Sequence, residues 1–390
     1  MKNILILIFF FITVKVEVYS QIDNESISIY NVIWKNPSEN SMGSMPIGNG
    51  DIGINLWVEE NGDLLFYLSK TDAWSENARL LKVGKVRLSL TPNPYIEGNV
   101  VIQELKLENG IIHIVAGKEL EKVTIDVWVD ANNPVVELDV KSEIPVTASI
   151  VSEPWRTEKR ALVNETELHS AYGLTGYGAP KVFVEKDSIL PNKAEGIVWL
   201  HRNKTSIWKD NLKLQGLSDY SDKNSDPLLN RTFGGLIRSK DLKKIDSNKM
   251  VSTKPLTKFS ISVLALTTVK VTQQEWEDQI TKNAISIASK SRVDRLNAHK
   301  DWWHSFWDRS FIHVSSKKSS DSVFNVSRNY NLQRYINACS GRGNSPIKFN
   351  GSIFTVDTKN VTDRFAGFDA DYRQWGGPYW WQNTRLPYWS

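Results

Sequence analysis

The side chains best suited to chemistry gather near the C-terminal end of this 390-residue chain. Gln382 and Asn383 supply amides, each a paired hydrogen-bond donor and acceptor, and Arg385 supplies a forked donor for hydroxyls or a carboxylate. The aromatic side chains that flank them are Trp375, Trp381 and Tyr388. Because a tryptophan offers a flat apolar face and one N–H donor, this combination favours a sugar-binding site. The alternative is that the same groups cap helices and satisfy loop carbonyl groups.

The chain is rich in aromatic residues, with 15 Trp, 12 Tyr and 14 Phe. Any single Trp most often packs in a core, but clustering favours a binding role for the group. Seven Trp lie after residue 300: Trp302, Trp303, Trp307, Trp375, Trp380, Trp381 and Trp389.

Four aspartates lie just upstream of this segment: Asp357, Asp363, Asp369 and Asp371. They could include a catalytic carboxylate or a cation site, but their spacing lacks the glycine and the terminal Glu of a calcium loop. Solvation of a loop is the favoured interpretation. The six His show no His-Glu-x-x-His spacing, and no Gly-x-Ser-x-Gly elbow occurs. We therefore expect neither a metal nor a cofactor.

The N-terminus predicts export. Lys2 precedes an apolar run from Ile4 to Val14, and the small residue Ser20 marks a cleavage point, which together are typical of a signal peptide. The alternative is a retained N-terminal anchor. No later stretch is long and uncharged enough for a membrane span, so we expect a secreted or periplasmic protein. The single cysteine, Cys339, is expected to be a buried hydrophobe.

The charge balance is too small to imply a polyanionic partner. The formal net charge is only +4, and basic residues alternate with acidic ones, as at residues 240–244 (KDLKK). This pattern is typical of solvated surface, and we expect no nucleic acid partner.

From about residue 27 to residue 270 the sequence consists of short β-type runs separated by turns such as Asn61-Gly62. So many strands without helices between them predict a large antiparallel sandwich, and thus a mainly β fold. The clearest runs are 64–68, 86–90, 100–105, 111–115, 123–129, 135–140, 148–151, 197–201 and 259–268.

Helical spacing replaces the strands at about residue 272. Residues 273–309 predict a helical linker in which Trp276, Ile280, Ile285, Leu296, Trp303 and Trp307 share one face. After a strand-like turn at 311–314, a second helix is expected from about residue 319 to Cys339, ended by Gly341 and Gly343. The predicted organisation is a signal peptide at 1–20, a β domain at 21–271, a helical linker at 272–312 and a further domain at 313–390.

Several short motifs carry a resemblance to known proteins. The glycine turn at 45–53 (MPIGNGDIG) and the segment 68–75 (LSKTDAWS) resemble the opening of family 95 glycoside hydrolases, the α-L-fucosidase type. Residues 299–310 (HKDWWHSFWDRS) resemble the linker helix of such enzymes. Through residues 348–351 (KFNG) and 382–388 (QNTRLPY), the chain is identified as a member of the secreted, glycosidase-like family of domain of unknown function 5703.

The resemblance implies a β-supersandwich, a helical linker and an (α/α)6 barrel of the six-hairpin glycosidase type that holds the active site. It also implies that Asn383 helps to position the attacking water, while Trp381 or Gln382 replaces the family's other asparagine. Inverting hydrolysis needs two carboxyl groups roughly 6.5 to 9.5 Å apart. Such a barrel needs about 300 residues and only about 80 follow the linker. We therefore expect a C-terminally truncated, inactive chain whose general acid lies beyond it.

Three functions remain open on the sequence: an exported glycoside hydrolase, a polysaccharide lyase acting on an acidic sugar, and a non-catalytic glycan-binding protein. Arg385 and Tyr388 would serve a lyase. The binding protein would keep the aromatic residues without the pair of carboxylates.

Overall fold

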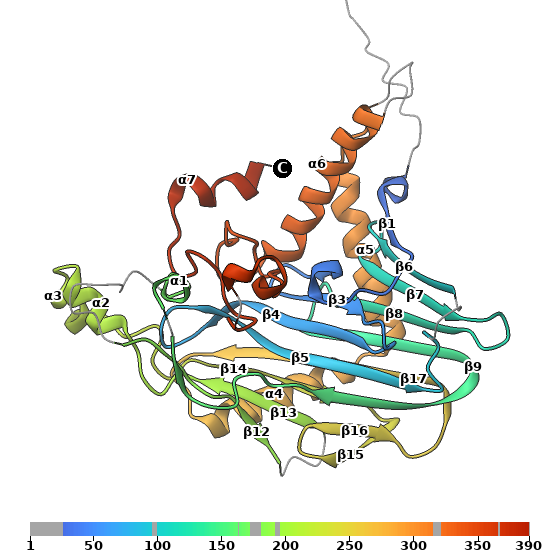
Figure 1. Cartoon of the computed structure of the whole chain (residues 1–390), viewed down its shortest axis with the longest axis horizontal. Helices are drawn as coiled ribbons and strands as arrows, with labels where there is room; N and C mark the ends of the chain where they lie inside the picture. The colour runs from blue at the N-terminus through green and yellow to red at the C-terminus, as the bar shows by residue number, and fades with distance from the viewer. Residues whose placement is uncertain are drawn as a thin grey trace, which may run out of the picture.

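The computed structural model describes residues 26–95, 100–162, 164–171, 181–191, 196–314, 321–365 and 367–389. The predicted signal peptide lies outside these residues. The fold is mainly β with antiparallel pairing throughout, which confirms the expected class (Figure 1). Among the described residues, every helix is too short or too polar to traverse a lipid bilayer.

One sheet runs in the order β1-β6-β7-β8-β9-β17-β14-β13-β12. Its strands are β1 (Val32–Trp34), β6 (Val100–Lys106), β7 (Ile111–Gly117), β8 (Val123–Val129), β9 (Val135–Ser152), β17 (Leu256–Thr268), β14 (Thr232–Arg238), β13 (Ile197–Arg202) and β12 (Ser188–Leu190).

A second group of strands runs from β2 through β3, β4 and β5 to β9, and on to β16 and β15. These strands are β2 (Met45–Gly48), β3 (Ile52–Val58), β4 (Leu64–Trp74), β5 (Leu80–Thr91), β16 (Lys249–Ser252) and β15 (Leu242–Asp246). A separate pair consists of β10 (Arg160–Ala161) and β11 (Phe183–Val184).

Strand β9 belongs to both groups. Residues 135–142 pair with β8 and β17, whereas residues 147–152 pair with β5 and 149–151 with β16. The sequence predicted two strands here, at 135–140 and 148–151, and this is wrong because the chain continues through an 18-residue strand. Pro145 falls at an irregularity of the β9–β17 ladder, between the pairs Lys141–Lys258 and Val146–Leu256, where its missing N–H interrupts no pairing.

The two groups of strands enclose one main core. Val86 and Ile150 from one group and Ile125 and Val263 from the other belong to the same buried apolar cluster. Trp199 on β13 crosses this core and donates its indole N–H to the carbonyl of Val83 at 2.8 Å.

Two helices occupy the predicted linker. The sequence predicted a helical linker at 273–309 with one shared apolar face. The structure divides it into α4 (Gln273–Ala288) and α5 (Arg292–Arg309), because the Ser291 side chain caps a new N-terminus. Helix α4 packs Trp276 on β14 and β17, whereas α5 packs Trp303 into the main core. Their apolar faces are therefore not shared, and Ile285 is 57% exposed.

Helix α6 (Asp321–Ser340) follows, stacking Tyr335 on Trp303 of α5 at 5.1 Å. The C-terminal end of α6 contacts the glycine turn between β2 and β3, where the Gly50 N–H donates to the Cys339 carbonyl at 2.9 Å. This confirms the prediction of a tight turn leading into a strand, and Cys339 is buried as expected. No strand forms at 311–314.

The remaining described elements are short. They are α1 (Glu165–Leu168), α2 (Trp208–Leu214), α3 (Ser218–Lys223), α7 (Trp381–Thr384), η1 (Ile27–Tyr30), η2 (Ser41–Gly43), η3 (Thr358–Asn360), η4 (Asp363–Phe365) and η5 (Leu386–Trp389). After residue 313 the described chain thus holds one long helix and mostly irregular segments, and the (α/α)6 barrel stays a prediction.

Candidate functional site

The segment 344–373 returns to the sheet and lies over β3, β4 and β5 (Figure 1). Ala370 joins Trp57, Leu65 and Tyr67 in a small apolar cluster on this face. Phe354 accepts a hydrogen bond from Asn55 of β3 through its carbonyl oxygen at 3.3 Å.

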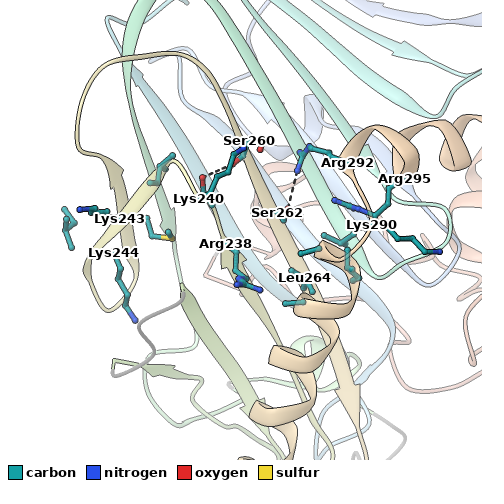
Figure 2. Close-up of a pocket in the computed structure, with 18 of the residues that line it drawn as sticks. Arg238, Lys240, Lys243, Lys244, Ser260, Ser262, Leu264, Lys290, Arg292 and Arg295 are labelled. Atoms are coloured by element: carbon teal, nitrogen blue, oxygen red, sulfur yellow. Dashed lines mark hydrogen bonds between the residues drawn. The ribbon is translucent and has the colours of Figure 1, made fainter.

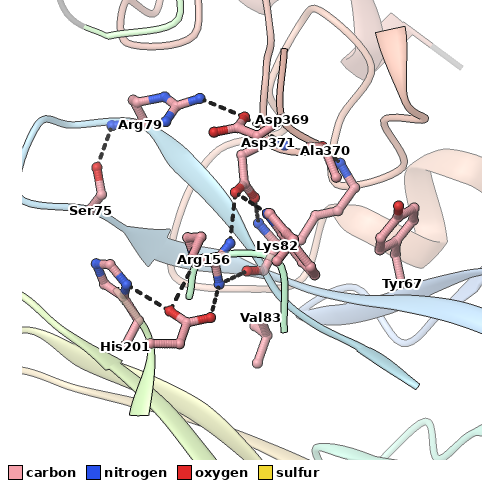
Figure 3. A network of polar contacts seen from close by, with 12 residues as sticks. Tyr67, Ser75, Arg79, Lys82, Val83, Arg156, His201, Asp369, Ala370 and Asp371 are labelled. Atoms are coloured by element: carbon pink, nitrogen blue, oxygen red, sulfur yellow. Dashed lines mark hydrogen bonds and ion pairs between the residues drawn. The ribbon is translucent and has the colours of Figure 1, made fainter. Parts of the chain in front are cut away.

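Buried charges hold this segment in place (Figure 3). Asp371 accepts hydrogen bonds from Arg156 at 2.7 Å, from the Trp155 indole at 2.8 Å and from the backbone N–H of Lys82 at 2.8 Å. The side chains of Arg156 and Asp371 are 1% and 0% exposed, so this ion pair is shielded from water. Lys82 also donates to the carbonyl of Ala370.

The network continues into the sheet through His201. Arg156 pairs with Asp187 at 2.9 Å, and His201 lies between Asp187 at 2.9 Å and Glu76 at 3.0 Å. Burial by itself lowers the pKa of His201, but hydrogen bonds to Asp187 and Glu76 outweigh it and raise that pKa to about 9. His201 is therefore a structural cation at neutral pH.

Asp369 is held by Arg79 at 3.0 Å and Arg160 at 2.6 Å. Burial raises its pKa, but the two guanidinium groups prevail and bring the pKa down to about 2. A carboxyl group with so low a pKa cannot donate a proton near neutral pH, so Asp369 does not suit a general acid.

Asp357 accepts hydrogen bonds from Ser41 at 2.6 Å and from Tyr67 at 2.9 Å.

The sequence favoured loop solvation for all four aspartates, and this is right only for Asp363, which is exposed on η4. The other three aspartates contact arginines or hydroxyl groups of the β domain, because the loop folds back onto the sheet. Within the described residues, no group of His, Cys, Asp and Glu is arranged to hold a metal ion.

The predicted binding residues lie in two neighbouring parts of the C-terminal segment. Trp375 has a left-handed backbone with φ +56°, a strained conformation for a bulky residue that costs about 1–3 kcal/mol. Asn350 stabilises this turn by donating to the carbonyls of Gln374 and Trp375. The exposed Trp375 ring packs beside Trp380 at 5.8 Å, and Trp380 stacks on Phe349 at 5.7 Å.

The other predicted residues lie on α7 and η5. Trp381 is 83% exposed. The side chains of Gln382, Asn383 and Arg385 form no hydrogen bond with another described residue, although the Arg385 guanidinium lies 5.4 Å from the ring centroid of Trp389. Tyr388 uses its hydroxyl to accept the N–H of Ile347 at 2.7 Å, which gives it a structural contact. Trp375 contacts Trp380 rather than Trp381, so the structure brings the set together only in part.

Two buried cations at this site were not predicted. Lys348 and Arg373 are 2% and 6% exposed, and neither pairs with a carboxylate of the described residues. Lys348 donates to the Pro378 carbonyl and lies 4.5 Å from the ring centroid of Tyr379. Burial, reinforced by Arg373, lowers the pKa of Lys348 to about 7, and burial lowers the pKa of Arg373 to about 10. The KFNG motif at 348–351 was the available signal, but nothing in it indicates burial.

Similarity to solved structures is low. The chain is 9% identical to a protein assigned as a kojibiose phosphorylase from the human microbiome, with a TM-score of 0.40, covering 78% of this chain and 41% of that one. It is also 9% identical to a bacterial glucoamylase in complex with acarbose, with a TM-score of 0.35, covering 79% of this chain and 44% of that one. The chain thus spans less than half the length of either structure.

No curated protein matches the chain. A family described as Domain of unknown function (DUF5703) matches residues 33–312, which extend from β1 to just beyond α5. The chain therefore belongs to the DUF5703 family.

Proposed function

We propose that this chain is part of an exported, glycan-directed protein of glycoside hydrolase type, and that its residues 375–389 form a sugar subsite. The observation that carries the proposal is the exposed aromatic ring of Trp375, held beside Trp380 by a strained turn. Strained backbone in a bulky residue is retained mainly where it serves a function. The resemblance to family 95 glycoside hydrolases and membership of the DUF5703 family support the same assignment.

In this proposal Trp375 and Trp381 stack on sugar rings, and Gln382 and Arg385 bind ring hydroxyls. Asn383 positions the attacking water. Because their polar groups are not satisfied by other described side chains, they are available to a ligand. Asp357, Asp369 and Asp371 take no catalytic part, since they are held by hydrogen bonds and ion pairs within the fold.

The subsite is tested by binding measurements on a panel of soluble oligosaccharides. Trp381→Ala and Arg385→Ala should weaken binding by about tenfold, the loss expected for a stacking or charge-assisted contact of about 1.4 kcal/mol. Trp208→Ala, at a partly buried tryptophan on α2, is the matched control and should bind as wild type does. Unchanged binding in both subsite variants, with folding intact, would leave the structural interpretation standing.

Asn383→Ala separates a catalytic from a binding role. If Asn383 positions the water, the variant in the complete protein should lose turnover far more than affinity, because the interaction forms chiefly in the transition state. The exposed Asn297 on α5 provides the control Asn297→Ala. A fall in affinity at constant turnover would instead support glycan binding without catalysis.

Export is tested at the N-terminus. We propose cleavage after Ser20. The measured mass of the secreted or periplasmic protein should therefore be that of a chain whose first residue is Gln21. Exported protein that still carries residues 1–20 would contradict this and support the retained anchor.

A polysaccharide lyase is the second candidate, and one observation favours it. Two buried cations, Lys348 and Arg373, have no carboxylate partner in the described chain, and Lys348 lies over the rings of Phe349 and Tyr379. A cation–π contact contributes about 0.5–2 kcal/mol, whereas burying an ion costs several kcal/mol. The carboxylate of an acidic sugar would offset that cost.

The lyase alternative predicts that Lys348→Met lowers affinity for polygalacturonate and leaves affinity for neutral oligosaccharides unchanged. Lys359→Met, at an exposed lysine on η3, is the control. An unsaturated, ultraviolet-absorbing product would identify elimination, while a reducing end without that absorbance would identify hydrolysis.

A further inference from the structure

A groove of about 1200 Å³ lies between the β15–β16 hairpin and the junction of α4 and α5 (Figure 2). Its floor is formed by β17 and by the end of β14, where Leu264 and Arg238 lie. Lys243 and Lys244 lie on the hairpin side, and Lys290 lies on the helix side.

The groove is strongly basic. Seven of its lining side chains are cationic and one, Asp246, is anionic. Two of the cations are neutralised by carboxylates of the β domain. Arg292 pairs with Asp139 at 2.6 Å and Arg295 pairs with Asp130 at 3.3 Å, and both arginines also pair with Glu137.

Three of the cations at the rim have no such compensation. Lys240, Lys243 and Lys290 are exposed and form no ion pair with any carboxylate that the structure describes. Asp241, the acid next to Lys240, instead accepts the backbone N–H of Ser260 at 3.2 Å. The groove therefore carries a surplus of positive charge that an anionic ligand would neutralise.

The sequence predicted that residues 240–244 are solvated surface, but it could not show that the fold brings further cations close to them. Lys240 and Lys243 are exposed, as expected, whereas Lys244 is partly buried and donates to the Pro191 carbonyl at 3.1 Å. The fold places them across a concavity from Lys290 and Arg292 of the helical linker. Low-dielectric walls around like charges focus the potential into such a cleft and raise the local concentration of anions.

We propose that this groove binds an acidic polysaccharide through its sulfate or carboxylate groups. The lining alternates cations with hydroxyls, such as those of Ser247 and Ser291, over an apolar floor that includes Leu264 and Ile287. These groups match an acidic sugar chain, which presents charges, hydroxyls and apolar ring faces. The inference does not depend on the C-terminal subsite, which shares none of these residues.

Two other polyanions fit less well. Single-stranded nucleic acids bind proteins by stacking bases on aromatic side chains, and none of the residues that line the groove is aromatic. An anionic membrane presents a flat surface, which would contact the rim lysines but not the floor. Both become outcomes of the test.

The experiment measures binding of the full chain to dextran sulfate, polygalacturonate and neutral dextran at two salt concentrations. The groove variant carries Lys240→Ala, Lys243→Ala and Lys290→Ala together. The matched control carries Lys118→Ala, Lys204→Ala and Lys209→Ala, three exposed lysines outside the groove. We expect binding to at least one acidic polysaccharide, no binding to dextran, and a dissociation constant raised about tenfold or more by the groove variant. The control should change it less than about twofold, because exposed charges that lie far from the ligand are screened.

Dextran sulfate and polygalacturonate distinguish a sulfate receptor from a carboxylate receptor. Equal losses in the groove and control variants would overturn the proposal, since they indicate attraction to net charge alone. Tighter binding of oligothymidylate, or of phosphatidylserine vesicles, than of either polysaccharide would also overturn it. So would the absence of binding to both acidic polysaccharides.

Discussion

His201 illustrates how burial fixes the role of a single residue in this protein. It lies between Asp187 and Glu76, whose pKa values are lowered although burial alone would raise them. A histidine with an ordinary pKa of 6.5 would be neutral at physiological pH, but here the pKa is about 9. The residue types alone gave no indication of this pairing, because the three residues come from different parts of the chain.

Stability should fall as the pH rises past neutrality. A raised pKa means that the stabilisation from His201 is fully present below pH 6.5 and is lost as the pH rises through about 9. The shift corresponds to about 3 kcal/mol of unfolding free energy. The lowered pKa values of Asp187 and Glu76 act in the opposite direction, since their stabilisation is lost as the pH falls through the acidic range.

Urea unfolding between pH about 6.5 and about 9 measures this effect. His201→Gln should be less stable than wild type at pH 6.5 and should show a flatter decline toward pH 9. His113→Gln, at a half-exposed histidine beside Asp126, is the control and should retain the wild-type slope. An identical slope in the His201 variant would show that another group titrates.

At the scale of elements, the attachment of two segments to the sheet decides the architecture. Helix α6 is received by the glycine turn at 48–53, and the segment 344–373 is held by buried charges. The turn was predicted from its glycines, but its function as a receptor for α6 was not. At Gly48 a β-carbon would lie 2.4 Å from the Cys339 carbonyl oxygen, so only glycine permits this close approach.

Gly48→Ala should therefore displace α6. We expect a loss of about 2 kcal/mol or more in unfolding free energy, because both close contacts of the new β-carbon are backbone atoms. Gly216→Ala is the control: its φ of +71° is strained but its surroundings are open, so the loss should be about 1–2 kcal/mol. Hydrogen exchange should reveal faster opening of α6 only in the Gly48 variant.

Asp371→Asn should loosen the segment 344–373. The substitution removes one of the two carboxylates that pair with the buried Arg156 and leaves only Asp187, which should cost about 1–3 kcal/mol. Limited proteolysis should then cut within 344–373 before it cuts the strands. Asp363→Asn, at the exposed aspartate of η4, should leave the digestion pattern unchanged. Resistance of the segment in the Asp371 variant would mean that its other contacts, such as the ion pairs of Asp369, hold it without Asp371.

At the scale of the whole molecule, β9 makes the two groups of strands interdependent. Its first half pairs with β8 and β17 and its second half with β5 and β16, while Val140 and Ile150 from the two halves enter one core. Neither group of strands can lose β9 without exposing the other.

We therefore expect a single unfolding transition for the β strands. Ile150→Ala should lower the stability by about 2–5 kcal/mol and shift tryptophan fluorescence and far-ultraviolet circular dichroism together. Val140→Ala, in the other half of β9, should move the same transition, and the exposed Glu143→Ala should not. Two separate transitions would contradict this account.

The sequence by itself determined the elements whose patterns are local. Alternation of apolar and polar residues predicted β7, β8, β13 and β17 near their observed bounds, and asparagine-glycine pairs predicted turns. Helical spacing predicted α4 and α5 but not the break between them, because a serine N-cap is a weaker signal than the apolar pattern around it.

Only the tertiary structure decided which charges are buried and which cations meet. Asp369 and Asp371 look like loop residues in the sequence but are paired with arginines that lie far away along the chain. Lys240 and Lys290 belong to separate surface stretches until the fold sets them around one groove. The physical reason is that electrostatic free energy depends on distance and dielectric environment in three dimensions, neither of which is fixed by the neighbours of a residue in the sequence.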